Sequence, residues 1–110
     1  MNPKFEVVFL EQALDFIDLL DFKTKKKFYY NIDKAKLAND PKLFKKLTSE
    51  IWEFRTKYSG LQYRLLAFWD KTKKAETLVV STHGIIKKVD KMPKAEIEKA
   101  MKIRAEYLDL

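Results

Sequence analysis

Two arginines and the single histidine are the side chains of this sequence best suited to chemistry. Arg55 and Arg64 lie in stretches with a strand pattern, and the planar fork of a guanidinium can hold two oxygens of one phosphate. His83 is the only histidine of the 110 residues, and an ordinary imidazole can accept or donate a proton near neutral pH. These residue types indicate charge stabilisation and proton transfer. Each has a structural alternative: an ion pair for either arginine, and packing at a strand end for the histidine.

Positive charge continues after His83. Lys87, Lys88 and Lys91 follow it along the chain. Clustered lysines stabilise negative charge, and a lysine whose pKa is lowered can also act as an acid or base. Either Lys87 or Lys88 could instead face solvent. Glu53 is the only acid within the predicted core strands, and it could simply pair with a neighbouring cation.

The net charge of +7 is unevenly distributed along the chain. Residues 41–94 hold 13 cations against 5 acids, whereas residues 1–22 hold 1 cation against 5 acids. A concentrated basic surface raises the local concentration of polyanions and speeds encounter with them. The charge placement therefore predicts a polyanionic partner, with a merely solubilising surface as the alternative.

Composition argues against several classes of function. The chain has no cysteine and one histidine, so disulfides are impossible and a zinc or iron site is not expected. It has no apolar run of about 18 residues, the length that a membrane-spanning helix needs, and its N-terminus lacks a signal pattern. We therefore expect a single cytoplasmic domain over residues 1–110, with no membrane contact, no metal and no other cofactor.

The first half of the chain changes from a strand pattern to a helix pattern. Residues 4–9 alternate apolar and polar side chains, which predicts a strand with one buried face. Residues 10–20 and 24–37 repeat apolar side chains at helical spacing and predict two helices. The second helix should end before Asn39-Asp40-Pro41, because a residue before proline is driven away from helical dihedrals. Residues 42–50 fit either one helical turn or a loop.

Three β-rich runs follow residue 50 and predict an antiparallel meander. The breaks between them fall at Ser59-Gly60 and at the charged residues 70–74. The third run is expected to end at His83-Gly84, where glycine would let the chain turn. Met92-Pro93 then opens a helix, since proline suits a first helical turn. The predicted order is β-α-α-β-β-β-α, an α+β domain.

Aromatic side chains lie close to the cations in these runs. Tyr58, Tyr63 and Trp69 could stack on nucleobases, although such rings more often belong to the core. Tyr63 and Arg64 are consecutive in a predicted strand, so their side chains point to opposite faces. This alternation favours packing for Tyr63.

Four segments, taken in order, resemble the RelE/HigB superfamily of type II toxins, and most closely its phage-derived, HigB-like branch. The segments are Trp52-Glu53-Phe54-Arg55, Gln62-Tyr63-Arg64-Leu65-Leu66, Thr82-His83-Gly84-Ile85-Ile86-Lys87-Lys88 and Lys91-Met92-Pro93. Each is short, but together they span the meander and the start of the last helix. Ile51, Phe54 and Ile85 are apolar substitutions within the family pattern, and no fixed catalytic triad is matched.

The resemblance implies two N-terminal helices and a C-terminal helix around a twisted, mainly antiparallel sheet. It also implies a metal-independent endoribonuclease that cleaves mRNA, often on the ribosome, by attack of the 2′-hydroxyl on the scissile phosphate. The implied partners are mRNA, the ribosome and a cognate helix-turn-helix antitoxin of the HigA-like kind, with which the toxin represses its own operon.

Residue type, placement and the resemblance together make nine side chains candidates, although Lys45-Lys46 could simply be solvated. The candidate catalytic residues are Arg64, His83, Lys88 and Arg55. The candidate RNA-binding residues are Lys45, Lys46, Lys57, Lys87 and Lys91. Which of them would transfer which proton is left open.

Two other functions remain compatible with the sequence. ParE-like relatives share this fold, target DNA gyrase and are not enzymes. A basic nucleic-acid-binding module without toxicity would explain the charge alone. The His83-Gly84 and Lys87-Lys88 pattern favours the ribonuclease over the ParE-like toxin.

Overall fold

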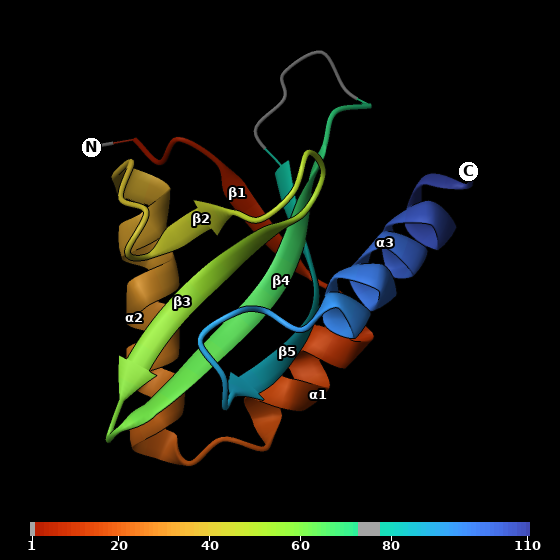
Figure 1. Cartoon of the computed structure of the whole chain (residues 1–110). Helices are drawn as coiled ribbons and strands as arrows, with labels where there is room; N and C mark the ends of the chain where they lie inside the picture. The colour runs from red at the N-terminus through yellow and green to blue at the C-terminus, as the bar shows by residue number, and fades with distance from the viewer. Residues whose placement is uncertain (1, 73–77) are drawn as a thin grey trace.

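The computed structural model of the chain, which describes residues 2–72 and 78–110, has one mixed β-sheet between helices (Figure 1). In chain order its elements are β1 (Glu6–Phe9), α1 (Glu11–Asp18), α2 (Phe22–Leu37), β2 (Phe44–Lys46), β3 (Trp52–Tyr58), β4 (Leu61–Asp70), β5 (Leu78–Lys87) and α3 (Lys94–Leu108). The α+β class and every predicted element are confirmed. One short strand, β2, was not predicted. The turn expected at residues 70–74 lies partly outside the described ranges.

The strands lie in the order β1-β5-β4-β3-β2. β1 is parallel to β5, and the other neighbours are antiparallel, so the expected mainly antiparallel sheet is confirmed. The unpredicted β2 has only three residues and forms one edge of the sheet. Its Phe44 is buried against Phe54, with ring centroids 4.4 Å apart. A strand this short has no readable period, which is why residues 42–50 were ambiguous.

α1 and α2 cover one face of the sheet (Figure 1). The α2 side chains predicted to share a face, Phe28, Ile32 and Ala35, are all buried. α2 begins at Phe22 because Asp21 caps it, its carboxylate accepting a 2.8 Å hydrogen bond from the Thr24 amide.

α3 packs on part of the opposite face. Met92 and Ala100, before and within α3, are buried in a second cluster with Leu66, Phe68 and Val80 of the sheet. α3 therefore covers the part of this face that carries these apolar side chains, together with buried His83, whose Nε2 lies 3.0 Å from Glu96 Oε1 of α3. The remaining part carries the charged side chains described below.

The expected turn at His83-Gly84 is wrong. β5 continues through both residues to Lys87. Gly84 is required for packing instead, because a Cβ at this position would overlap the ring of Phe16 in α1. The glycine lets α1 approach the sheet closely.

Candidate functional site

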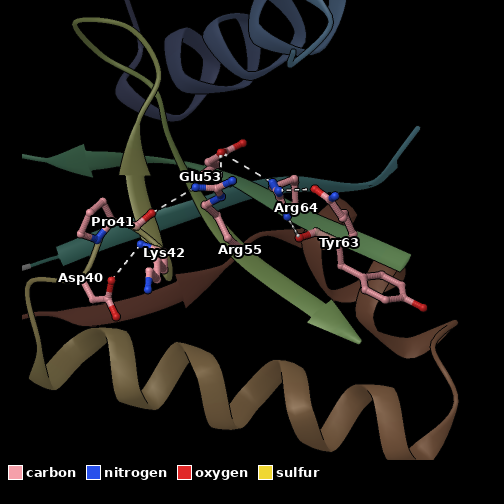
Figure 2. Close-up of polar contacts among 8 residues, drawn as sticks. Asp40, Pro41, Lys42, Glu53, Arg55, Tyr63 and Arg64 are labelled. Carbon is pink, nitrogen blue, oxygen red and sulfur yellow. Dashed lines mark hydrogen bonds and ion pairs between the residues drawn. The ribbon is translucent and has the colours of Figure 1, made fainter. Parts of the chain in front are cut away.

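The candidate site lies on the sheet face opposite α1 and α2, beyond the part covered by α3. Arg55 of β3 and Arg64 of β4 are direct cross-strand partners there. Side chains two residues apart in a strand share a face, so Glu53 lies on the same side as Arg55. Figure 2 shows the two guanidinium groups beside the Glu53 carboxylate.

Arg64 is held in one orientation by its neighbours. It is only 3% exposed, and it donates from Nη1 to the Tyr63 carbonyl at 3.0 Å and from Nη2 to Gln62 Oε1 at 2.7 Å. Burial lowers the pKa of the Arg64 guanidinium, the Glu53 carboxylate opposes this shift, and Arg55 adds to it. The group stays charged at neutral pH because a guanidinium is so strongly basic.

Glu53 is the shared partner of both arginines and is itself buried. Its Oε2 lies 3.4 Å from Arg55 Nε and 3.6 Å from Arg64 Nε. Arg55 also donates from Nη1 to the Pro41 carbonyl at 3.3 Å. The Arg55 side chain is 28% exposed, so it borders solvent above the buried Glu53–Arg64 pair.

Three buried polar atoms of this cluster have no hydrogen-bond partner among the described residues. They are Glu53 Oε1, Arg55 Nε and Arg64 Nε. Buried polar atoms are nearly always hydrogen-bonded in folded proteins. Both Nε atoms lie in ion-pair range of Glu53 Oε2, so the unused capacity of the cluster is the Glu53 Oε1 acceptor.

Lys87 adds a third cation from β5. Burial lowers the pKa of the Lys87 ammonium, and the guanidinium groups of Arg64 and Arg55 lower it further, whereas Glu53 and Asp90 oppose the shift. A lysine with a lowered pKa gives up its proton more readily at neutral pH. Lys87 is therefore the side chain of this cluster best suited to proton donation.

Two hollows, each of about 350 Å³, lie on either side of Arg55. The first, here called the Arg64 hollow, is lined by Lys42, Arg55, Lys57, Gln62 and Arg64. The polar lining of the second, the Lys87 hollow, is Lys45, Glu53, Arg55, Lys87, Asp90 and Lys91. Cations far outnumber the two carboxylates, so both hollows attract anions.

His83 lies on the same sheet face but beneath α3. It is 3% exposed, with Nδ1 at 3.0 Å from Thr82 Oγ1 and Nε2 at 3.0 Å from Glu96 Oε1. Burial lowers the pKa of the imidazole, and the hydrogen bond to Glu96 opposes this shift. His83 lines neither hollow. Its role in proton transfer stays a prediction.

The structure divides the predicted RNA-binding lysines between the two hollows. Lys57 lines the Arg64 hollow, and Lys45, Lys87 and Lys91 line the Lys87 hollow. Lys46 follows Lys45 in β2, so its side chain points to the other face of the sheet.

Lys88, predicted to be catalytic, is exposed and follows the last residue of β5. It lines neither hollow, so the structure brings Lys87 rather than Lys88 to the arginines.

The aromatic side chains near the cations pack mostly into the core. Tyr63 is 5% exposed and lies in the core on the helix side of the sheet, as its alternation with Arg64 predicted. In Figure 2 its ring points away from the Arg64 head group. Tyr58 and Trp69 pack against the same core but are only partly buried.

Sequence reasoning missed two residues of the site, Lys42 and Gln62, which line the Arg64 hollow. The pairing of Glu53 with a neighbouring cation, which the sequence offered as its role, is confirmed by its contacts with both arginines. The signal for Gln62 was its spacing of two residues from Arg64, which puts both side chains on the same face. Lys42 gives no such signal, because it precedes β2 in the segment that could not be assigned.

Neither a metal cluster nor a membrane span is present in the described part of the chain. Within residues 2–72 and 78–110, no group of three or more His, Cys, Asp or Glu side chains could hold a metal ion. No helix among the described residues is both long and apolar enough to cross a membrane.

The mixed five-stranded sheet, with two helices on one face and a third on the other, fits the RelE-like fold in general. The family model described as phage derived protein Gp49-like matches residues 15–105. The chain therefore belongs to the Gp49-like family, a toxin–antitoxin-associated family within the RelE/HigB-like toxin superfamily. An antitoxin partner follows from this membership. No curated protein matches the sequence significantly.

Proposed function

We propose that this chain is the toxin of a type II toxin–antitoxin system. It acts as a metal-independent endoribonuclease that cleaves mRNA bound to the ribosome. The main support is the cluster of Arg55, Arg64 and Lys87 around the single carboxylate of Glu53. Among the described residues seven cations line the two hollows against the carboxylates of Glu53 and Asp90, so positive charge is left uncompensated there. A scissile phosphate would supply the missing negative charge.

The proposed reaction needs no group from outside the RNA and the protein. The 2′-oxygen of the substrate gives its proton to the Glu53 carboxylate and forms a bond to phosphorus, and the bond from phosphorus to the 5′-oxygen breaks. The leaving 5′-oxygen takes up a proton. The products are a 2′,3′-cyclic phosphate and a 5′-hydroxyl end.

Each member of the cluster has a role that suits its environment. Arg55, at the border with solvent, would bind the phosphate oxygens as the negative charge grows, and the positive charge of the buried Arg64 guanidinium would add to this stabilisation. The lowered pKa of Lys87 suits it to protonate the leaving oxygen. Glu53 Oε1, which has no partner among the described residues, could accept a hydrogen bond from the 2′-hydroxyl.

The same basic surface supports a proposal for the partners. The lysines of the Arg64 and Lys87 hollows would bind the mRNA backbone and ribosomal RNA through their phosphates. A HigA-like helix-turn-helix antitoxin that covered this face would neutralise the toxin by blocking the hollows. Placement in the HigB-like branch is part of this proposal.

The test is controlled expression in cells with mapping of new 5′-hydroxyl RNA ends. Wild type, Arg55→Gln and Lys87→Gln are compared with Lys34→Gln, which removes an exposed lysine of α2 that lines neither hollow. We expect cuts within translated frames for wild type and Lys34→Gln, and their loss in the two site variants.

Three other outcomes would overturn the proposal. Growth arrest without new RNA ends but with DNA damage would point to a gyrase-directed, ParE-like toxin. Cuts that persist in both site variants would move the active site elsewhere. Unaltered growth, with folded protein present, would leave a basic binding module.

A further inference from the structure

A second cationic surface lies on the sheet face that α1 and α2 cover, beyond the C-terminal end of α2. Trp52 of β3 and Trp69 of β4 are the only tryptophans of the chain. Both line a hollow of about 190 Å³ together with Lys46 and Lys71. We call it the tryptophan hollow. It belongs to neither of the hollows around Arg55.

The two indole rings are held from the core side. Phe44 stacks on Trp52 with centroids 4.9 Å apart and an interplanar angle of 25°. Phe5 meets Trp69 edge-on at 5.2 Å. The indoles themselves are perpendicular, with centroids 6.0 Å apart. Because both rings are only partly buried, they present a fixed aromatic wall to the hollow.

The charge around the tryptophan hollow is positive. Lys46 and Lys71 are exposed lysines on its rim. Among the described residues of the lining the one carboxylate is Glu50, which forms an ion pair with Arg104 of α3, at 3.2 Å between Oε2 and Nη2. Glu50 is therefore compensated, and the two lysines remain to attract an anion.

The size and chemistry of the hollow fit one flat ring attached to a phosphate. Pockets for whole small molecules usually begin at about 300 Å³, so the hollow of about 190 Å³ is small for one. An aromatic wall beside lysines is the combination that binds single-stranded nucleic acid, in which bases stack and phosphates pair with cations.

β2 connects this hollow to the candidate active site. Lys45 pairs in register with Glu53, and Lys46 pairs with Trp52. Because consecutive side chains of a strand point to opposite faces, Lys45 lines the Lys87 hollow and Lys46 lines the tryptophan hollow. β2 is one of the two edge strands, so a single RNA strand that passed around this edge would contact both lysines.

We propose that the tryptophan hollow is a base-stacking subsite for single-stranded RNA, in which Trp52 and Trp69 receive a nucleobase and Lys46 and Lys71 bind the adjoining phosphates. The inference rests on the proposed function and extends it, because it gives the substrate a path from the scissile phosphate around β2 to the other face. The protein then holds RNA on both sides of its edge strand.

Tryptophan fluorescence tests the subsite directly, since both tryptophans of the chain line it. The probe is a 2′-O-methyl RNA oligonucleotide of mixed sequence, which cannot be cleaved by 2′-hydroxyl attack. Fluorescence of the folded full chain is titrated at two salt concentrations, and total binding is measured separately by anisotropy of a dye-labelled copy of the same oligonucleotide.

The key variant is Lys46→Glu/Lys71→Glu, which leaves both indoles in place. Its control, Lys26→Glu/Lys34→Glu, makes the same charge change with two exposed lysines of α2 that line no part of the hollow. We expect quenching with wild type and about a tenfold weaker affinity for the key variant. Loss of two phosphate contacts should also lower the slope of log affinity against log salt by about 1.4.

Failure of the subsite is distinguishable from failure of the proposed function. Binding by anisotropy without quenching, or equal weakening by the control variant, would overturn the subsite alone, because cleavage could still depend on Arg55 and Lys87. If the oligonucleotide does not bind and no new RNA ends arise in cells, both proposals fail.

Discussion

Arg55 and Arg64 lie directly opposite each other on β3 and β4, and both reach the same Glu53 oxygen. Like charges at such cross-strand positions are destabilising. Burying the Arg64 guanidinium beside a second guanidinium also destabilises the folded chain, because the charge loses its contact with water. An anionic ligand would explain this arrangement, since ionisable groups in unfavourable environments are concentrated at functional sites.

The two arginines should differ sharply in what they contribute to stability. Arg64→Ala leaves the buried Glu53 with only a partly exposed partner, and breaking a buried pair costs about 3–5 kcal/mol. Arg55→Gln removes the ion pair of a partly exposed side chain with Glu53 but also relieves a like-charge pair, so it should change the free energy of unfolding by less than about 1 kcal/mol. Urea denaturation of the purified variants measures both values.

This difference decides which variant can test function. Arg64→Ala alone would confuse loss of activity with loss of fold, so Arg64→Lys, which keeps a cation beside Glu53, serves as its control. A fully stable Arg64→Ala protein would mean that Glu53 does not need Arg64, and would remove the argument that the cluster is costly.

His83 should make stability fall on acidification. Burial lowers the pKa of its imidazole in the folded chain, so near pH 6 the unfolded chain binds a proton that the folded chain resists. Stability is then full above the unfolded pKa of about 6.5 and declines as the pH falls below it. His83→Gln removes the only imidazole of the chain and should flatten the unfolding free energy between about pH 7 and pH 5.

Thermal unfolding of wild type and His83→Gln across that range measures the effect. Parallel curves for the two proteins would mean that the hydrogen bond to Glu96 cancels the effect of burial on the pKa of His83. Retained RNA cleavage by a folded His83→Gln protein would leave His83 a structural link between β5 and α3, whereas its loss would support the catalytic role predicted from the sequence.

Gly84 should be intolerant of a methyl group because of Phe16. A Cβ there would overlap the phenylalanine ring, and overpacking of a core typically costs about 1–3 kcal/mol. The expected signature is non-additivity: Phe16→Ala is itself destabilising, but in its presence Gly84→Ala should cost much less. Melting temperatures of the two single variants and the double variant test this. Equal costs in both backgrounds would contradict the packing argument.

Local patterns predicted the elements of this fold but not the contacts between them. The helical spacing of Phe28, Ile32 and Ala35 identified the buried face of α2, and alternation placed Tyr63 in the core. The packing reason for Gly84 could not be read locally, because it depends on Phe16, which belongs to another element.

The site was predicted in part for the same reason. Arg55 and Arg64 were recognised as candidates from their residue type and the resemblance. That both contact Glu53 follows from the strand register, which places Arg55 opposite Arg64. Lys45 and Lys46 were treated alike because β2 was not recognised as a strand. Once β2 is present, alternation sends them to opposite faces.

Lys87 should matter for cleavage far more than Lys88. Lys87 lies with the arginines, and Lys88 is exposed beyond the end of β5. General acid catalysis contributes about 10²–10⁴-fold to a rate, so Lys87→Gln should lower the rate of cleavage by that order, with Lys88→Gln within a few-fold of wild type. Comparable losses in the two variants would point to general charge attraction instead.

The pH profile of cleavage separates proton donation by Lys87 from simple charge attraction. An acid must be protonated, so activity should fall as the pH rises through the pKa of Lys87, which burial and Arg64 lower. Asp90 raises that pKa and Arg55 lowers it. Asp90→Asn should therefore move the alkaline limb of the profile to lower pH, and Arg55→Gln should move the limb of its residual activity to higher pH. If the alkaline limb of the profile stays at the same pH in both variants, a group other than Lys87 donates the proton.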